Sequence, residues 1–198
     1  MSTRSIILTI GNQNYSNELS IIRHYKHSDG YPSGVLPLLI ETLESCEKEV
    51  KEYNDHWKNF KSSTPKVISN DFFSGRLIGF GSSVYGQGVN VDAYEDDKAT
   101  YDGKLEYKHL GYQEDLEWIY ILDLNNKTLN IYGGSYSGQG PDVAVKKGFV
   151  NPEKYIKKLK DDYQNKELEL TKECVAKVEG LGFKINKIKN KFSKGVKS

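Results

Sequence analysis

Apolar and polar residues alternate in two short segments near the N-terminus, and this alternation predicts a pair of β-strands. Residues 5–10 (SIILTI) are mostly apolar, and the turn-forming residues GNQNYSN follow them. Residues 19–27 (LSIIRHYKH) read as the second strand of a hairpin. The alternation places Ile21, Arg23, Tyr25 and His27 on one face of that strand, and Ile22, His24 and Lys26 on the other.

After the second strand the apolar spacing changes to three and four residues, which predicts an amphipathic helix from Ser33 to about Asp55. Ser33 is the expected N-cap, and Pro37 is expected in the first turn, where its missing N–H does no harm. A shorter helix is expected over residues 71–80, although its two glycines weaken the pattern. The apolar face of the first helix consists of Val35, Leu36, Leu39, Ile40, Leu43, Cys46 and Val50.

The second half of the chain contains a clear hairpin and a further helix. In residues 117–134 (EWIYILDLNNKTLNIYGG) two alternating segments flank the turn NNKT. Asn151 and Pro152 are typical of a helix start, and the helical spacing continues to about Glu179. Strands followed by helices, then strands and a helix, predict an α+β fold: an antiparallel sheet of hairpins with packed helices and a long C-terminal helix.

Length and composition fit one domain over residues 1–198, with an α+β core in 1–150 and a C-terminal helix and basic tail in 151–198. No apolar run approaches the roughly 20 residues of a membrane span, and no basic-then-apolar signal pattern begins the chain. We therefore expect a cytoplasmic protein without membrane contact. Cys46 and Cys174 lie in expected helices, so buried free thiols are the simplest reading.

Charge is balanced overall, with a formal net charge of +1, which argues against nucleic acid as a partner. Arginine is scarce: only Arg4, Arg23 and Arg76 are present among 28 basic residues. In a chain that otherwise uses lysine, a retained arginine is a candidate for planar, bidentate contact with phosphate or carboxylate. A structural salt bridge is the competing use for each of them.

Familiar catalytic and cofactor motifs are missing from the sequence. His24, His27 and Asp29 form H-x-x-H-x-D, but residues three apart on a strand point to opposite faces, so we expect no metal site. No G-x-S-x-G elbow is present, and the glycine-rich segments match neither the dinucleotide fingerprint nor the P-loop. We expect no catalytic residues and no cofactor. Two GQG loops, residues 85–91 and 136–143, could face a common ligand.

A group of recognition residues remains near the end of the second strand. The arginines would contact phosphates, the tyrosines would stack on a base or ribose, and His27 and Asp29 would orient hydroxyl groups. The structural alternative is that Asp29 and Gly30 form a turn, Tyr31 packs and Pro32 stiffens the helix entry. The candidate ligand-binding residues are Arg4, Arg23, Tyr25, His27, Asp29, Tyr31 and Arg76.

Three segments, TRSIILTI, YKHSDGYPSGVLPLL and EWIYILDLNNKTLNIYG, resemble a family of small proteins common in phages and their bacterial hosts. The family carries a Tyr-Arg-His-x-Asp-Gly-Tyr-Pro motif, of which the DGYP block is the most specific part. This chain departs from the pattern at Lys26, usually Arg, and at Ser28, often Trp. The resemblance covers residues 3–43 and 115–133.

The resemblance implies a phage context, and hence the cytoplasm of the host cell. Small phage proteins of this kind include antagonists of bacterial nucleotide-signalling defences. The first hypothesis is therefore a sponge that sequesters a nucleotide-derived immune signal of the cyclic ADP-ribose type, and the chain is also a candidate for homo-oligomer formation. The alternatives are a hydrolase of such a signal, with His27 and Asp29 as acid and base, and a protein-binding inhibitor of a host defence effector.

Overall fold

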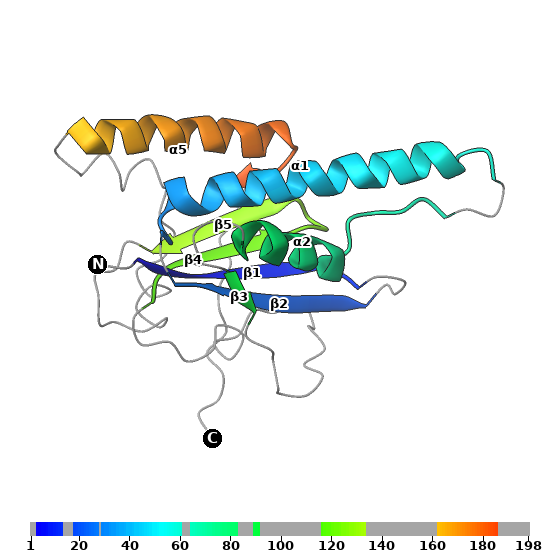
Figure 1. Ribbon diagram of the computed structural model, residues 1–198, viewed down its shortest axis with the longest axis horizontal. Helices are drawn as coiled ribbons and strands as arrows, with labels where there is room; N and C mark the ends of the chain where they lie inside the picture. Colours follow the sequence, from blue (N-terminus) through cyan, green and yellow to red (C-terminus); the bar gives the residue numbers. More distant parts are fainter. Residues whose placement is uncertain are drawn as a thin grey trace, which may run out of the picture.

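A mixed β-sheet of six strands, in the order β3-β2-β1-β4-β5-β6, forms the centre of the computed structural model (Figure 1). The structure describes residues 3–13, 18–27, 29–60, 64–82, 89–91, 116–133 and 162–185. The strands in these ranges are β1 (Arg4–Asn12), β2 (Leu19–Lys26), β3 (Val89–Val91), β4 (Leu116–Asp123), β5 (Thr128–Gly133) and β6 (Lys184–Ile185). The helices are α1 (Pro32–Trp57), α2 (Asn70–Ser82) and α5 (Asp162–Gly180).

The N-terminal hairpin is confirmed. Strands β1 and β2 pair antiparallel from Ser5 opposite Lys26 to Asn12 opposite Leu19. The expected alternation on β2 is also confirmed, because buried His24 packs towards α2 while its neighbour Tyr25 lies on the opposite face. The β4–β5 hairpin likewise forms as expected, with a turn between Asp123 and Thr128.

The expectation of a wholly antiparallel sheet was wrong. Strand β4 pairs with β1 in parallel, with Ile7 opposite Tyr120 and Thr9 opposite Leu122. Parallel neighbours need a long crossover connection, and helices α1 and α2 lie in the segment that separates β1 from β4. Because this pairing joins distant parts of the chain, local alternation does not reveal it. Val89–Val91, expected in a loop, instead forms β3 at the edge beside β2.

The three described helices pack on one face of the sheet and build the main hydrophobic core (Figure 1). Side chains from β1, β4 and β5 meet the apolar faces of the helices there. Helix α5 ends close to the expected residue, whereas its predicted start at Asn151 lies outside the described residues. None of the described helices is long and apolar enough to cross a membrane. The largest fully buried side chains include Phe73, Leu36, Leu39, Leu43, Leu77, Trp118 and Tyr120.

Helix α1 begins two residues earlier than the sequence predicts, counted from its N-cap residue. Tyr31, not Ser33, is the N-cap residue, and it makes no side-chain capping hydrogen bond. Pro32 occupies the start of the helix, where its fixed φ angle is compatible with helical geometry. Pro37 lies inside the helix rather than in its first turn, on the exposed side.

The DGYP segment is a tightly packed turn between β2 and α1. The Gly30 amide donates a hydrogen bond to the Thr3 carbonyl at 2.9 Å, and the buried Tyr120 hydroxyl donates one to the Gly30 carbonyl at 2.8 Å. A Cβ on Gly30 would lie 2.8 Å from the Thr3 carbonyl oxygen, and one on Gly34 would lie 2.2 Å from the Asp29 carbonyl oxygen. Both glycines are therefore required by close backbone approach, and the turn-making interpretation of this segment is confirmed.

We predict that Gly34→Ala destabilises the protein by about 1–3 kcal/mol, because the added methyl group must displace the Asp29 backbone. Gly75→Ala in α2 is the matched control: nothing lies within 4 Å of the new Cβ, so better helix propensity stabilises the protein by about 0.5–1 kcal/mol. Urea unfolding followed by circular dichroism measures both effects. Equal unfolding midpoints for Gly34→Ala and the wild type would contradict the steric account.

Candidate functional site

The face of the sheet opposite the helices, here called the far face, carries two of the three arginines. By strand alternation Arg4 lies on this face of β1, and Arg23 and Tyr25 lie on this face of β2. Arg23 is opposite Leu8, and Tyr25 is opposite Ile6. All three candidate residues are partly exposed. The far face therefore carries positive charge and an aromatic ring next to the aliphatic side chains of Leu8 and Ile6, which are fully buried.

His27 extends this group past the end of β2. Its imidazole Nδ1 lies 3.4 Å from the Tyr25 hydroxyl, and the two rings meet edge to face with centroids 6.2 Å apart. Continuing the β1–β2 register by one residue brings His27 opposite Arg4. The structure thus brings Arg4, Tyr25 and His27 to one end of the hairpin.

Asp29 and Tyr31 form a second pair in the turn itself. The Tyr31 hydroxyl donates a hydrogen bond to Asp29 Oδ1 at 3.0 Å, and the Tyr31 ring packs partly against the helix-side core. Asp29 adopts a positive φ of 54°, a left-handed conformation that Asp tolerates better than most residues. Burial lowers the pKa of Lys26, and the carboxylate of Asp29 opposes that change. The left-handed backbone conformation and the hydrogen bond from Tyr31 therefore both fix the position of the Asp29 side chain.

Arg76 lies apart from the other candidates. It projects from α2, and its guanidinium forms an ion pair with Glu49 of α1. It also lies over the Phe72 ring, with Cζ 5.7 Å from the ring centroid. These contacts place Arg76 in the helix layer, on the other side of the sheet from Arg23 and Tyr25. A structural salt bridge was the competing role considered for each arginine, and Arg76 has that role.

Glu117 was missed by sequence reasoning. Burial raises the pKa of its carboxyl group, and the positive charge of Arg4 opposes that rise. The pairing of β1 with β4 shifts register between Arg4 and Ser5, opposite Leu116 and Trp118, and Glu117 lies at this irregularity. Only the parallel β1–β4 pairing brings Glu117 towards Arg4, so no local sequence signal could have identified it.

A buried polar cluster joins α2 to the sheet on the helix side. His24 Nε2 lies 3.1 Å from Ser74 Oγ and 3.3 Å from Thr9 Oγ1, and these two hydroxyls are 3.1 Å apart. A serine beside a histidine suggests nucleophilic catalysis. However, His24 has no exposed surface, and within the described part of the chain its Nδ1 has no hydrogen-bonding partner to orient the ring. The cluster is therefore a structural contact.

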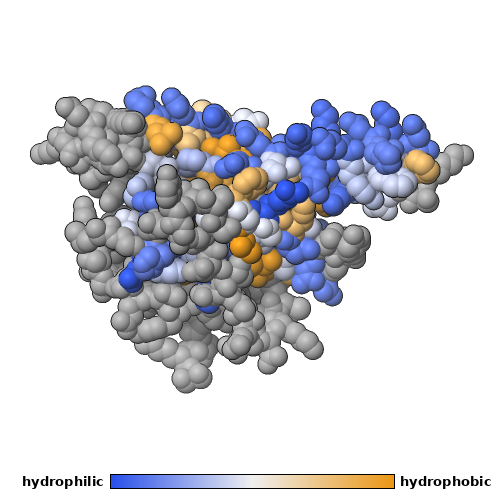
Figure 2. Space-filling model, viewed as in Figure 1, coloured by the Kyte–Doolittle hydropathy of each residue, from blue (hydrophilic) through white to orange (hydrophobic). Residues whose placement is uncertain are grey.

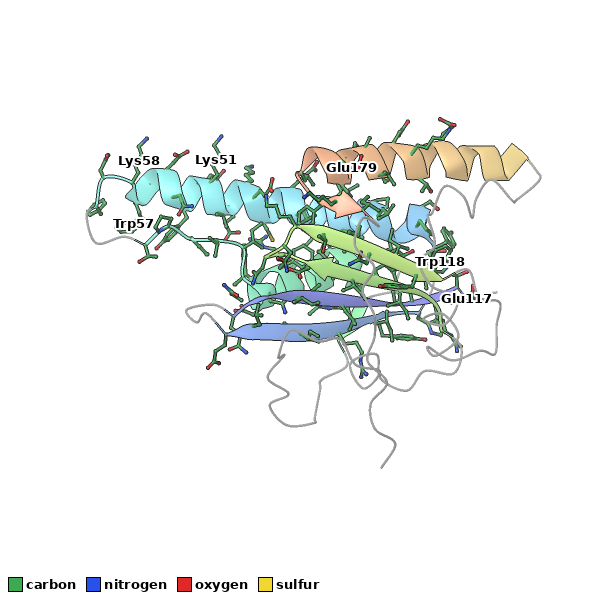
Figure 3. All side chains as sticks on the ribbon, turned by 180° about the vertical axis from the view of Figure 1, so that it is seen from behind. Lys51, Trp57, Lys58, Glu117, Trp118 and Glu179 are labelled. Carbon is green, nitrogen blue, oxygen red and sulfur yellow. The ribbon has the colours of Figure 1, made fainter. Side chains whose placement is uncertain are left out.

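An exposed aromatic cluster occupies the far end of α1. Trp57 is 37% exposed and Phe60 is 55% exposed, with ring centroids 4.9 Å apart, and Tyr53 lies 6.2 Å from Trp57. Two hydrogen bonds between the Asn54 side chain and the Lys66 backbone tie the following segment to the helix. Figure 3 shows Trp57 and Lys58 at one end of the molecule and Glu117 at the other. The aromatic cluster and the far-face residues are thus separate surfaces.

The surface along the outer side of α1 and α5 is largely hydrophilic, as Figure 2 shows.

Among the described residues, no group of three His, Cys, Asp or Glu side chains is arranged to hold a metal ion. Cys46 and Cys174 are buried free thiols, as expected, and burial raises the pKa of Cys46 to about 11. The GQG segment of residues 136–143 and most of the basic tail lie outside the described residues.

Comparisons with protein-family models, with curated proteins and with solved structures found no match. The resemblance to small phage proteins therefore stays a prediction.

We predict that His24 makes the stability of the protein depend on pH. Burial lowers the pKa of His24 from 6.5 to about 4, so the unfolded state binds the proton more tightly than the folded state. The stabilisation is fully present above pH 6.5 and is lost as pH falls towards 4, by about 3 kcal/mol in total. Urea unfolding at several pH values measures this loss.

His24→Gln should remove most of this dependence of the unfolding free energy on pH, since glutamine does not titrate. His27→Gln is the matched control, because His27 is exposed and lies outside the buried cluster. Identical pH slopes in the wild type and His24→Gln would contradict the assignment.

Proposed function

We propose that this protein binds and sequesters a nucleotide-derived signal of the cyclic ADP-ribose type. One observation carries the proposal: Arg23 and Tyr25 share the far face of β2, and Arg4 and His27 lie at the adjacent end of the hairpin. An anionic, base-containing molecule needs both kinds of group, because guanidinium groups hold phosphate and an aromatic ring stacks on a base or ribose.

Arg4 and Arg23 are the two arginines that the hairpin carries on the far face. Burial raises the pKa of the Glu117 carboxyl group, and the positive charge of Arg4 opposes that rise. A partly exposed arginine on a strand can present its fork to a ligand from a fixed backbone, which reduces the entropy lost on binding. The proposed phosphate contacts are thus Arg4 and Arg23, whereas Arg76 is assigned to the helix layer.

Sequestration is better supported than hydrolysis. An acid–base pair needs two groups within reach of the same reacting atoms. His27 instead contacts the Tyr25 hydroxyl, and Asp29 accepts a hydrogen bond from Tyr31. Each candidate group has a tyrosine partner, which is an arrangement suited to orienting hydroxyl groups of a ligand. The anti-defence role in a phage-infected cell rests on the sequence resemblance alone.

We predict that calorimetric titration with cyclic ADP-ribose isomers detects binding, and that Arg23→Lys weakens it about tenfold because lysine cannot form the bidentate contact. Arg76→Lys is the matched control and should leave the affinity unchanged. Heating the complex should release the ligand intact.

No binding of any nucleotide in the panel would contradict the proposed function. Recovery of a chemically altered ligand, with the alteration lost in His27→Ala, would instead establish the hydrolase alternative.

The aromatic cluster at the end of α1 supports a second function, binding to a host effector protein. Tryptophan and tyrosine are enriched at the energetic centres of protein interfaces. This cluster combines Tyr53, Trp57 and Phe60 with Lys66, whose ammonium group lies 5.4 Å from the Tyr53 ring centroid. Because it lies away from the far-face residues, this surface could act independently of a small ligand.

If that second function is correct, the wild-type protein forms a stoichiometric complex with a host protein in size-exclusion chromatography without added nucleotide. Trp57→Ala should weaken the complex at least about tenfold, as truncation of an interface hot spot does. Leu170→Ala is the matched control, since Leu170 is also an exposed apolar residue but lies on α5. Equal complex formation by Trp57→Ala would exclude the aromatic cluster as the interface.

A further inference from the structure

Helix α1 has an apolar stripe that continues past the hydrophobic core. Its positions follow one another at alternating intervals of three and four residues, the spacing of a helix that packs along another helix. The stripe consists of Leu36, Leu39, Leu43, Cys46, Val50, Tyr53 and Trp57. Its first four residues are buried, Val50 is half-buried, and Tyr53 and Trp57 are exposed. One side of α1 is therefore apolar along its whole length but is buried only in its first half.

The second half of α1 projects beyond the sheet and beyond the end of α5 (Figure 1). Residues 51–53 and 55–60 are all exposed. Five large apolar side chains are exposed in the described part of the chain, and four of them lie on this projection or on the segment that returns from it. These four are Tyr53, Trp57, Phe60 and Val67. Exposed apolar surface gathered in one place is typical of a protein-binding site.

Contacts within the projection hold its aromatic rings in place. The Asn54 side chain donates to the Lys66 carbonyl at 2.9 Å and accepts from the Lys66 amide at 2.7 Å. The Lys66 ammonium group then lies 5.4 Å from the Tyr53 ring centroid and 4.8 Å from that of Phe72. A surface that is ordered in the free protein loses less entropy when a partner binds.

Charge is distributed unevenly along this part of the chain. Residues 44–52 contain four acidic residues and two lysines, whereas residues 58–66 contain three lysines and no acidic residue. A partner of a single charge sign would face its own sign at one of these two segments. A second copy in antiparallel orientation places the lysine-rich segment of each copy beside the acidic segment of the other, and two-fold symmetry repeats the match. The projection is thus self-complementary in charge.

We propose that the partner of the aromatic cluster is a second copy of this chain, and that two α1 helices cross antiparallel at their projecting ends. With the two-fold axis midway between Tyr53 and Trp57, each Trp57 packs on the Tyr53 of the other copy. Lys58 of one copy then lies level with Glu52 of the other. Asp55 lies two residues from either ring, on the opposite side of the helix, so the two Asp55 carboxylates point away from the contact. This assignment rests on the proposed protein-binding role of the aromatic cluster and names a partner other than a host protein.

Sedimentation equilibrium of the full chain, without nucleotide, tests the dimer. Four apolar side chains from each copy make a small interface, so we expect a monomer–dimer equilibrium with a Kd of about 1–10 μM. Trp57→Ala should raise that Kd at least about tenfold, because it removes the largest ring of the contact. Leu170→Ala is the matched control: Leu170 is 38% exposed and Trp57 is 37% exposed, but Leu170 lies on α5.

Lys58→Glu tests the antiparallel orientation. The new carboxylate would face the acidic segment of the other copy, so the Kd should rise about three- to tenfold, and added salt should lower it again by screening the repulsion. In a parallel dimer residue 58 would face its own counterpart, and replacing two lysines by two glutamates would leave the Kd unchanged. Lys177→Glu changes an exposed lysine of α5 in the same way and should have no effect.

Three results would overturn the dimer. A wild-type protein that stays monomeric at about 200 μM, well above the expected Kd, but forms a Trp57-dependent complex with a host protein refutes self-association while the protein-binding role stands. A dimer that Trp57→Ala and Lys58→Glu both leave unchanged uses another surface. If the wild type neither dimerises nor binds a host protein, the dimer and the protein-binding role both fail.

Discussion

The hydrogen bond from the Tyr120 hydroxyl to the Gly30 carbonyl joins parts of the chain that are ninety residues apart. Tyr120 belongs to the parallel strand β4, and Gly30 lies in the turn that leads into α1. Gly30 in turn donates to Thr3, next to the first residue of β1. Because the bond is buried, its loss would leave a polar group without water or a partner. The bond therefore ties the turn that precedes α1 to β4.

The two faces of the sheet carry different kinds of side chain. On one face, His24 Nε2 lies within hydrogen-bonding distance of the Thr9 and Ser74 hydroxyls where α2 meets the strands. On the other, Arg23 and Asn130 stand on the same row of residues without belonging to the helix-side core. Alternation along β2 is sufficient to produce this separation, since each step of one residue reverses the direction of the side chain. Side chains at adjacent positions of a strand therefore have different surroundings.

Much of the local structure could be predicted from the sequence, whereas its assembly could not. The β1–β2 alternation, the apolar face of α1 and the β4–β5 turn follow from spacing alone, because each depends on neighbours along the chain. The parallel β1–β4 pairing depends on contacts across more than a hundred residues, so Glu117 carried no local signal. Arg76 was grouped with the other arginines because scarcity says nothing about position, and its ion pair with Glu49 separates it from them.

The two tryptophans of the chain lie in contrasting surroundings at opposite ends of the molecule (Figure 3). Trp118 is 1% exposed and stacks near Tyr120, while Trp57 is 37% exposed at the end of α1. Indole emission shifts to shorter wavelengths when the ring leaves water, so the two side chains contribute distinct components to the intrinsic fluorescence. An aqueous quencher would reach Trp57 first. The native chain thus carries its own pair of optical probes, one for the helix tip and one for the sheet beside the turn.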